Sequence, residues 1–256
     1  MLTYSASIQL STRSLVWLGE QIRAHREAIG SRWRRLDPSE QALLVLAHLR
    51  CGDTYARLAA GFKVGIATVY RYVTEAVDLI AAAAPTLEQV IRRAAMLVWL
   101  ILDGTQIPID RVADQKPYYN GHKRRHTVNA QFLADARGRL LWTSPALPGS
   151  VHDLAAARAH AIPDLLTRHA VAALADKAYQ AAGPTIAVPF KGRNLSANQK
   201  SVNRSLAKAR ALGERAAATL KCWKILTKLR CCPRRATPIL AAITVLQHVE
   251  DQRWSG

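Results

Sequence analysis

The stretch AAMLVWLILDGTQIPI, Ala94–Ile109, predicts a buried strand that ends in a single acid. Residues 94–102 form an unbroken apolar run of bulky and branched side chains, as expected for a central strand covered on both faces. The run stops at Asp103, whose carboxylate would lose hydration there and would need a cation, a proton or a hydrogen-bond donor. The alternative is an Asp that only starts a turn by bonding its own backbone.

The composition favours a globular protein with a polyanionic partner. Half of the 256 residues are hydrophobic, which is enough for one large domain or two smaller ones. Lys and Arg number 36 against 18 Asp and Glu, and this net charge of +18 favours DNA, RNA or an anionic membrane surface. No apolar run approaches the ~20 residues of a membrane span, and the N-terminus lacks the order of a signal peptide. We therefore expect a cytoplasmic, nucleoid-associated protein that binds nucleic acid and no membrane.

The cysteines give no sign of a metal or disulfide framework. Cys51, Cys222, Cys231 and Cys232 are either far apart or adjacent in the sequence. Because that spacing suits neither a zinc site nor a set of disulfides, we expect them to act as small apolar side chains.

Residues 1–85 predict a helical domain. Apolar residues recur at helical spacing over 12–29, and Asp37-Pro38-Ser39-Glu40 has the spacing of a capping box at the start of a second helix. Asp53 can then cap a short helix over 54–60.

The end of this domain has the layout of a helix-turn-helix, at about residues 53–82. Gly61 follows the short helix as a turn, and a longer helix is predicted over 65–80. The second helix of such a unit enters the major groove of DNA, where its early residues meet the bases. A plain helical bundle is an almost equal alternative, and the basic charge of the chain favours DNA binding. The predicted base-contacting residues are Thr68, Tyr70 and Arg71.

Residues 94–256 predict a sheet with flanking helices. Polar and apolar residues alternate over 127–133, a turn follows, and 140–143 returns as a strand, so these two segments and the 94–102 strand can form a meander. Residues 171–175 repeat the first pattern, because this short apolar run ends in Asp176. Residues 186–190 are a further candidate strand.

Two basic segments are candidates for contact with phosphates. The loop after Ile109 contains Lys123, Arg124 and Arg125, although a solvated loop is an equally good interpretation. A long basic helix is predicted to begin after Ser196 and to end at Cys231-Cys232-Pro233, and it includes Lys208, Arg215 and Lys221.

One acid, Glu214, lies within this basic helix. Its plain interpretation is an ion pair with Arg210 four residues earlier. The alternative groups it with Asp103 and Asp176, since carboxylates with open positions for water and phosphate are the ligands that Mg²⁺ or Mn²⁺ prefers. Two such ions, ~3.5–4 Å apart, can promote displacement at a phosphodiester.

The motifs LDGTQIPI, YYNGHKRRH, LPGSVHD, LADKAY and LGERAAATLKCWKILTKLR resemble the DDE transposases of bacterial insertion sequences, in the group related to Harbinger elements. The resemblance covers nearly the whole chain. It implies a ribonuclease-H-like mixed sheet flanked by helices, residues 94–256, behind an all-α helix-turn-helix domain, residues 1–85. It also implies Mg²⁺- or Mn²⁺-dependent cleavage and transfer of double-stranded DNA at element terminal repeats and target sites, by a homo-oligomer on the DNA. The implied catalytic and metal-binding residues are Asp103, Asp176 and Glu214, with His152 and Asp153 in support.

Two positions depart from the family pattern. Ala178 stands where a glycine is expected after the second acid, and a turn that needs positive φ there would be strained. Gly65 stands where a polar helix cap is expected. The first departure keeps open a non-catalytic, sequence-specific DNA-binding protein, either regulatory or decayed. A structure-directed RNA nuclease is a third hypothesis, which the helix-turn-helix disfavours because the RNA major groove is too narrow for a helix.

Overall fold

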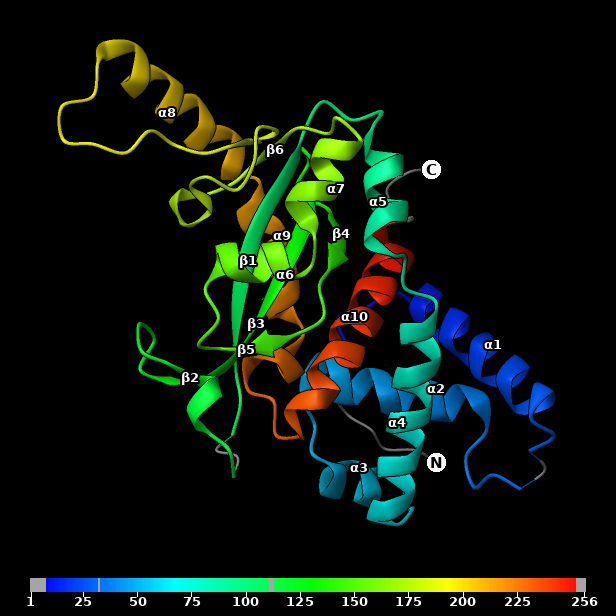
Figure 1. The fold of residues 1–256 in the computed structure, drawn as a ribbon. Coiled ribbons are helices and arrows are strands. Elements are labelled where there is room, and N and C mark those ends of the chain that lie inside the picture. The colour runs from blue at the N-terminus through cyan, green and yellow to red at the C-terminus, as the bar shows by residue number, and fades with distance from the viewer. Residues whose placement is uncertain (1–7, 32, 111–112, 252–256) are drawn as a thin grey trace. The chain divides into compact units, whose positions relative to one another are not determined.

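The computed structural model describes residues 8–31, 33–110 and 113–251 of the chain. The chain forms two compact units, which are discontinuous in sequence (Figure 1). Within the described residues, none of the helices combines the length and the apolar character needed to cross a membrane. The domain bounds 1–85 and 94–256 stay a prediction. The first compact unit differs from the predicted first domain, since it combines the N-terminal segment with residues 221–227 and 238–256.

The first unit is helical. The capping box predicted at Asp37 is present, since its side chain accepts from the Glu40 N–H at 2.8 Å and Glu40 accepts from the Asp37 N–H at 3.0 Å. Glu250 joins the two ends of the unit by accepting hydrogen bonds from the backbone and side chain of Ser11 and from the side chain of Ser14. The elements are α1 (Thr12–Ala28), α2 (Pro38–Leu46), a π-helical turn η1 (Ala47–Cys51), α3 (Tyr55–Phe62), α4 (Ile66–Ala82), η4 (Lys224–Thr227) and most of α10 (Ala236–Asp251).

The second unit is a mixed sheet with helices on both faces. Its helices and turns are α5 (Leu87–Ala94), η2 (Lys116–Tyr118), α6 (Asp153–Ala159), α7 (Ile162–Arg168), η3 (Lys177–Tyr179), α8 (Ala197–Arg210), α9 (Gly213–Cys222) and η5 (Pro233–Arg235). Its strands are β1 (Leu100–Pro108), β2 (Tyr119–Asn120), β3 (Arg125–Ala134), β4 (Leu140–Thr143), β5 (Leu147–Pro148), β6 (Ala173–Leu174) and β7 (Ile186–Ala187).

Strand β1 is central in this sheet. It pairs antiparallel with β3 over eight residue pairs and parallel with β6 over two, and β7 continues the parallel part beyond β6. Strand β4 pairs antiparallel with β3, so the predicted meander of three strands is present. The prediction of a ribonuclease-H-like mixed sheet flanked by helices, behind an N-terminal helical region, is confirmed.

Alternate residues of β1 face two different layers. Leu100 and Leu102 belong to a buried apolar cluster with side chains of α5, α6 and α7. On the other face, Gly213 at the start of α9 lies so close to Ile101 that an added Cβ would be 2.8 Å from its Cγ2. In Figure 1, α6 and α7 lie in front of the strands and α9 behind them.

The strand predicted over 94–102 lies further along the chain in the structure, at Leu100–Pro108, so Asp103 lies inside the strand and does not end it. Helix α5 runs through Ala94, and β1 begins only at Leu100. Between them, Met96 and Val98 are 91% and 84% exposed, so this half of the apolar run is a surface connection. The strand predicted over 186–190 is likewise limited to Ile186–Ala187. Periodicity cannot separate a buried strand from a helix end plus an apolar loop when all the side chains are apolar.

Candidate active site and DNA-binding surfaces

Asp103 lies within β1, where its Oδ1 accepts a hydrogen bond from the Gly104 N–H at 2.8 Å. Burial raises the pKa of the Asp103 carboxyl, and the nearby carboxylates of Asp176 and Asp153 raise this pKa further. The Gly104 N–H and the Arg210 guanidinium lower the same pKa. Asp103 is therefore a half-buried acid whose charge is disfavoured mainly by burial, with Arg210 and two further acids nearby.

Asp176 is brought beside Asp103 by the parallel pairing of β1 with β6. The ladder aligns Leu100 with Ala173 and Ile101 with Leu174. Continued by two residues, the same register aligns Asp103 with Asp176, at the ~4.8 Å spacing of neighbouring strands and on one face. Asp176 Oδ1 accepts from the Ala178 N–H at 2.7 Å. In the described part of the chain, no Lys or Arg forms an ion pair with either aspartate, as the seven ion pairs found there lie elsewhere.

Glu214 lies on the same face of the sheet as Asp103. It follows Gly213, which packs against Ile101, and the side chains of Ile101 and Asp103 point to one face because they are two residues apart on a strand. The Glu214 side chain is exposed. It is the only acid between Asp176 and Glu250 in the sequence.

The predicted continuous helix from Ser196 to Cys231 is wrong. The Ser196–Gln199 capping box is present, but α8 ends at Arg210, α9 starts at Gly213, and α9 ends at Cys222. Arg210 and Glu214 are separated by this break, and the described ion pairs do not include them. The glycine at the start of α9 allows a close approach to Ile101 that a residue with a Cβ would not.

Arg210 lies close enough to Asp103 to act on its charge, which its position four residues before Glu214 did not predict. It is half-buried, its charge lowers the pKa of Asp103, and its Nε is buried without a hydrogen-bond partner among the described residues. The sequence had suggested it only as a partner for Glu214. Its guanidinium is instead the main positive charge acting on Asp103.

The two residues of the His152-Asp153 pair differ in exposure, since His152 is exposed and Asp153 is half-buried. His152 is the N-cap residue of α6, without a side-chain capping bond. Asp153 Oδ1 accepts hydrogen bonds from Asn129 Nδ2 at 2.8 Å and from Gln131 Nε2 at 3.2 Å. Sequence reasoning missed Asn129 and Gln131 as site residues, although both stand on the polar face of the alternating 127–133 segment.

The residues present suit a divalent cation held by few protein ligands. Asp103 and Asp176 supply two oxygen ligands on one face, and Glu214 stands on the adjacent helix. A Mg²⁺ ion keeps several waters and needs only one or two carboxylates, so the pair is a sufficient anchor. A complete cluster of three or more His, Cys, Asp or Glu side chains around one point is not found within the described residues.

The helix-turn-helix layout is present in α3 and α4. The turn differs from its prediction, because Gly61 lies inside α3 and Lys63 takes the left-handed conformation, with φ of 53°. Gly65 is the N-cap of α4 and provides no side-chain bond, as its sequence indicated. On α4, Tyr70 and Arg71 are exposed and Thr68 is half-buried, and Arg71 donates to Thr68 Oγ1 at 3.4 Å.

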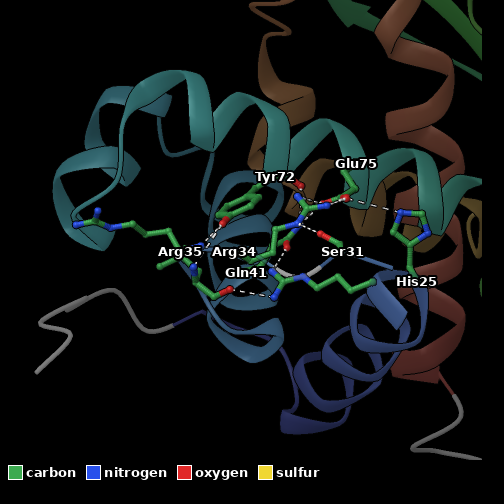
Figure 2. A network of polar contacts seen from close by, with 9 residues as sticks. His25, Ser31, Arg34, Arg35, Gln41, Tyr72 and Glu75 are labelled. Atoms are coloured by element: carbon green, nitrogen blue, oxygen red, sulfur yellow. Dashed lines mark hydrogen bonds and ion pairs between the residues drawn. The ribbon is translucent and has the colours of Figure 1, made fainter. Parts of the chain in front are cut away.

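A network of polar contacts joins α4 to α2 and to the segment before it (Figure 2). Glu75 of α4 accepts from Arg34 Nη2 at 2.7 Å and from Gln41 Nε2 at 3.0 Å. Tyr72 of the same helix accepts from the Arg35 N–H at 3.0 Å. Arg26 of α1 donates to the Leu36 carbonyl at 3.0 Å and to the Gln41 side chain. These bonds fix the helix that carries Thr68, Tyr70 and Arg71.

The other predicted DNA-contacting residues are all on exposed surface. Lys123 and Arg124 lie in the turn between β2 and β3, and Arg125 is the first residue of β3. Helix α8, which carries Lys208, has no buried residue and extends away from the sheet in Figure 1. Arg215 and Lys221 are exposed on α9.

Comparison with known protein families assigns both regions. Residues 34–86 match the family model described as the helix-turn-helix of DDE superfamily endonuclease, and this range includes α2, α3 and α4. Residues 102–248 match the model described as DDE superfamily endonuclease, which covers more than half of the chain. No curated protein and no solved structure matches the chain. The chain belongs to the DDE superfamily of endonucleases.

Proposed function

We propose that this protein is a transposase that binds the ends of its element and catalyses metal-dependent cleavage and transfer of DNA strands. The observation that carries the proposal is the pair Asp103 and Asp176, which share one face of the sheet without an ion-pair partner among the described residues. Like charges placed together cost free energy, which a divalent cation from solution would offset.

In this mechanism Asp103 and Asp176 would hold the cations, and Glu214 of α9 would be a third ligand. Two Mg²⁺ or Mn²⁺ ions would supply activation of the attacking hydroxyl and stabilisation of the leaving oxygen. The Gly104 N–H and the Ala178 N–H orient the two carboxylates by bonding one oxygen of each. Arg210 adds a positive charge next to the acids, where a phosphate would lie.

DNA recognition is divided between specific and non-specific contacts. Thr68, Tyr70 and Arg71 on the exposed side of α4 would meet base edges in the major groove. Lys123, Arg124, Arg125, Lys208, Arg215 and Lys221 would contact phosphates, and the affinity should then fall steeply as the salt concentration rises. We include in the proposal a homo-oligomer assembled on the DNA and membership of the Harbinger-related group of DDE transposases.

The test is cleavage of DNA that carries the terminal repeats flanking the gene, in the presence of Mn²⁺. We expect strand cleavage by the wild type and its loss in Asp103→Ala, Asp176→Ala and Glu214→Gln. Asp164→Asn is the matched control, because Asp164 is an exposed acid on α7 of the same unit. Wild-type cleavage by the Asp103 variant would reject the assignment.

A non-catalytic DNA-binding protein is the second candidate. It is favoured by the exposed position of Glu214, since the three acids do not form a complete cluster within the described residues. Specific binding of the terminal repeats by wild type, with no cleavage at any Mn²⁺ concentration, would support it. Competition with duplex RNA in the same binding assay separates both candidates from an RNA nuclease, because the helix-turn-helix requires duplex DNA.

A further inference from the structure

A chain of buried polar side chains lies on the face of the sheet opposite Asp103. Asn129 and Gln131 of β3 and Tyr179 of η3 are all 0% exposed. Gln131 Nε2 donates to Asn129 Oδ1 at 3.0 Å, and Tyr179 Oη donates to Gln131 Oε1. Asp153 accepts from both amides, so the four side chains form one connected network. Polar groups at this depth cost several kcal/mol unless they are bonded, and such a network defines one arrangement.

One end of the network lies against the residue that follows Asp103. A Cβ added to Gly104 would be 2.3 Å from Asp153 Oδ1 and 3.0 Å from Gln131 Nε2. The carboxylate of Asp153 therefore occupies the space that any other residue at position 104 would fill. The same Gly104 donates its N–H to the Asp103 carboxylate on the opposite face.

The other end of the network holds the turn that follows Asp176. Tyr179 is the last residue of η3, and its N–H donates to the Asp176 carbonyl at 3.2 Å. Its buried hydroxyl bonds to Gln131, so the turn that begins at Asp176 is attached to β3. Strand β3 is in turn aligned with β1 over eight residue pairs, which include Asp103.

The bond from Tyr179 to Gln131 holds the Asp176 turn at a level where the backbone pairing of β1 with β6 has already ended. Strands β1 and β6 pair only at Leu100–Ala173 and Ile101–Leu174, two residues before the acids. Two carboxylates at adjacent strand positions repel each other, and nothing in that short ladder opposes their separation. The bond from Tyr179 to Gln131 joins the Asp176 turn to the well-paired half of the sheet.

We propose that Tyr179 and Gln131 are positioning residues that fix the separation of Asp103 and Asp176 for cation binding. This inference rests on the proposed function. It requires that loss of the Tyr179 hydroxyl weakens cation binding, because the carboxylates are then free to move apart in the absence of metal.

The experiment measures the Mn²⁺ dissociation constant of the full chain by electron paramagnetic resonance of free Mn²⁺, together with thermal unfolding. We expect Tyr179→Phe to raise the dissociation constant about tenfold, in line with other residues that orient metal ligands. Cleavage at saturating Mn²⁺ should stay within about threefold of wild type, because bound cations draw the carboxylates together. Gln131→Met should raise the dissociation constant at least as much.

Tyr72→Phe is the matched control. Tyr72 is also buried, and its hydroxyl also bonds inside the protein, but to the backbone of Arg35 in the helical unit. Both variants lose one buried hydroxyl, so both should lower the melting temperature to a similar degree, and only Tyr179→Phe should change Mn²⁺ binding. Unchanged Mn²⁺ binding in Tyr179→Phe, with normal binding by wild type, overturns the positioning role alone. A wild type that binds no Mn²⁺ overturns both this role and the proposed function.

Discussion

The two units differ in the partners that they give to a half-buried carboxylate. In the helical unit, the Glu75 carboxylate accepts from the side chains of Arg34 and Gln41, so its charge is compensated within the chain. In the sheet unit, Asp103 and Asp176 each accept, among the described residues, only from a backbone N–H of the next one or two residues. The first arrangement stabilises a fold and holds a helix in place. The second is a cluster of like charge that gains stability from a cation supplied from outside.

The largest effect on stability is expected from removing the compensated charge. Glu75→Ala leaves Arg34 without its carboxylate and Gln41 without an acceptor, so the free energy of unfolding should fall by about 2 kcal/mol. Urea titration followed by circular dichroism measures this. Glu20→Ala, an exposed acid on α1, is the control and should change stability by less than about 0.5 kcal/mol. Equal effects of the two substitutions would contradict the structural role of Glu75.

Removal of the Asp103 charge should raise the free energy of unfolding of the metal-free protein, whereas removal of the Glu75 charge lowers it. Asp103→Asn removes a negative charge that burial, Asp176 and Asp153 disfavour more than the Gly104 N–H and Arg210 favour it, so it should stabilise the metal-free protein by about 1 kcal/mol. The measurement is the same titration in EDTA, with Asp164→Asn as the control acid. A loss of stability as large as that of Glu75→Ala would mean that Asp103 is also a structural charge.

The gain from Asp103→Asn should depend on pH. Because burial raises the pKa of Asp103, the folded protein binds this proton more tightly than the unfolded chain does. The cost of the ionised carboxylate is therefore full above its raised pKa and disappears as the pH falls below the ordinary value of 3.8. Melting temperatures of variant and wild type in EDTA should differ most at neutral pH and converge towards pH 4. A difference that is constant with pH would show that charge is not its cause.

The smallest effect is expected at Ala178. The structure gives no positive φ at this residue and leaves its side chain exposed, so the strain considered from the sequence is absent. Ala178→Gly should lower stability by less than about 1 kcal/mol, through greater freedom of the unfolded chain, and should leave cleavage unchanged. A tenfold increase in cleavage would show instead that this position needs a glycine.

Local signals in the sequence predicted two helix starts, but the cap predicted at Asp53 is wrong, because Thr54 is the N-cap residue of α3. The capping boxes at Asp37 and Ser196 depend on residues three apart, and both are present. The order of the strands that lead to Asp103 and Asp176 followed from runs of apolar residues, although the first half of the 94–102 run proved to be mostly exposed.

Features that depend on distant packing were not predictable. The start of α9 at Gly213 packs against Ile101, more than a hundred residues earlier in the chain. The polar side chains of Asn129 and Gln131 had the alternation of a solvated face, yet α6 covers them, and only the fold brings Tyr179 to the same network. A sequence pattern gives the faces of a strand, and the partners of each face come from the topology.

The central claim is that Asp103 and Asp176 form a pair that binds divalent cations. Calorimetric titration of Mn²⁺ into the full chain tests this most directly, with Asp103→Asn, Asp176→Asn and Asp164→Asn measured alongside wild type. We predict saturable binding by wild type and Asp164→Asn, and its loss in each of the other two variants. Binding that persists unchanged in Asp103→Asn and Asp176→Asn would contradict the claim.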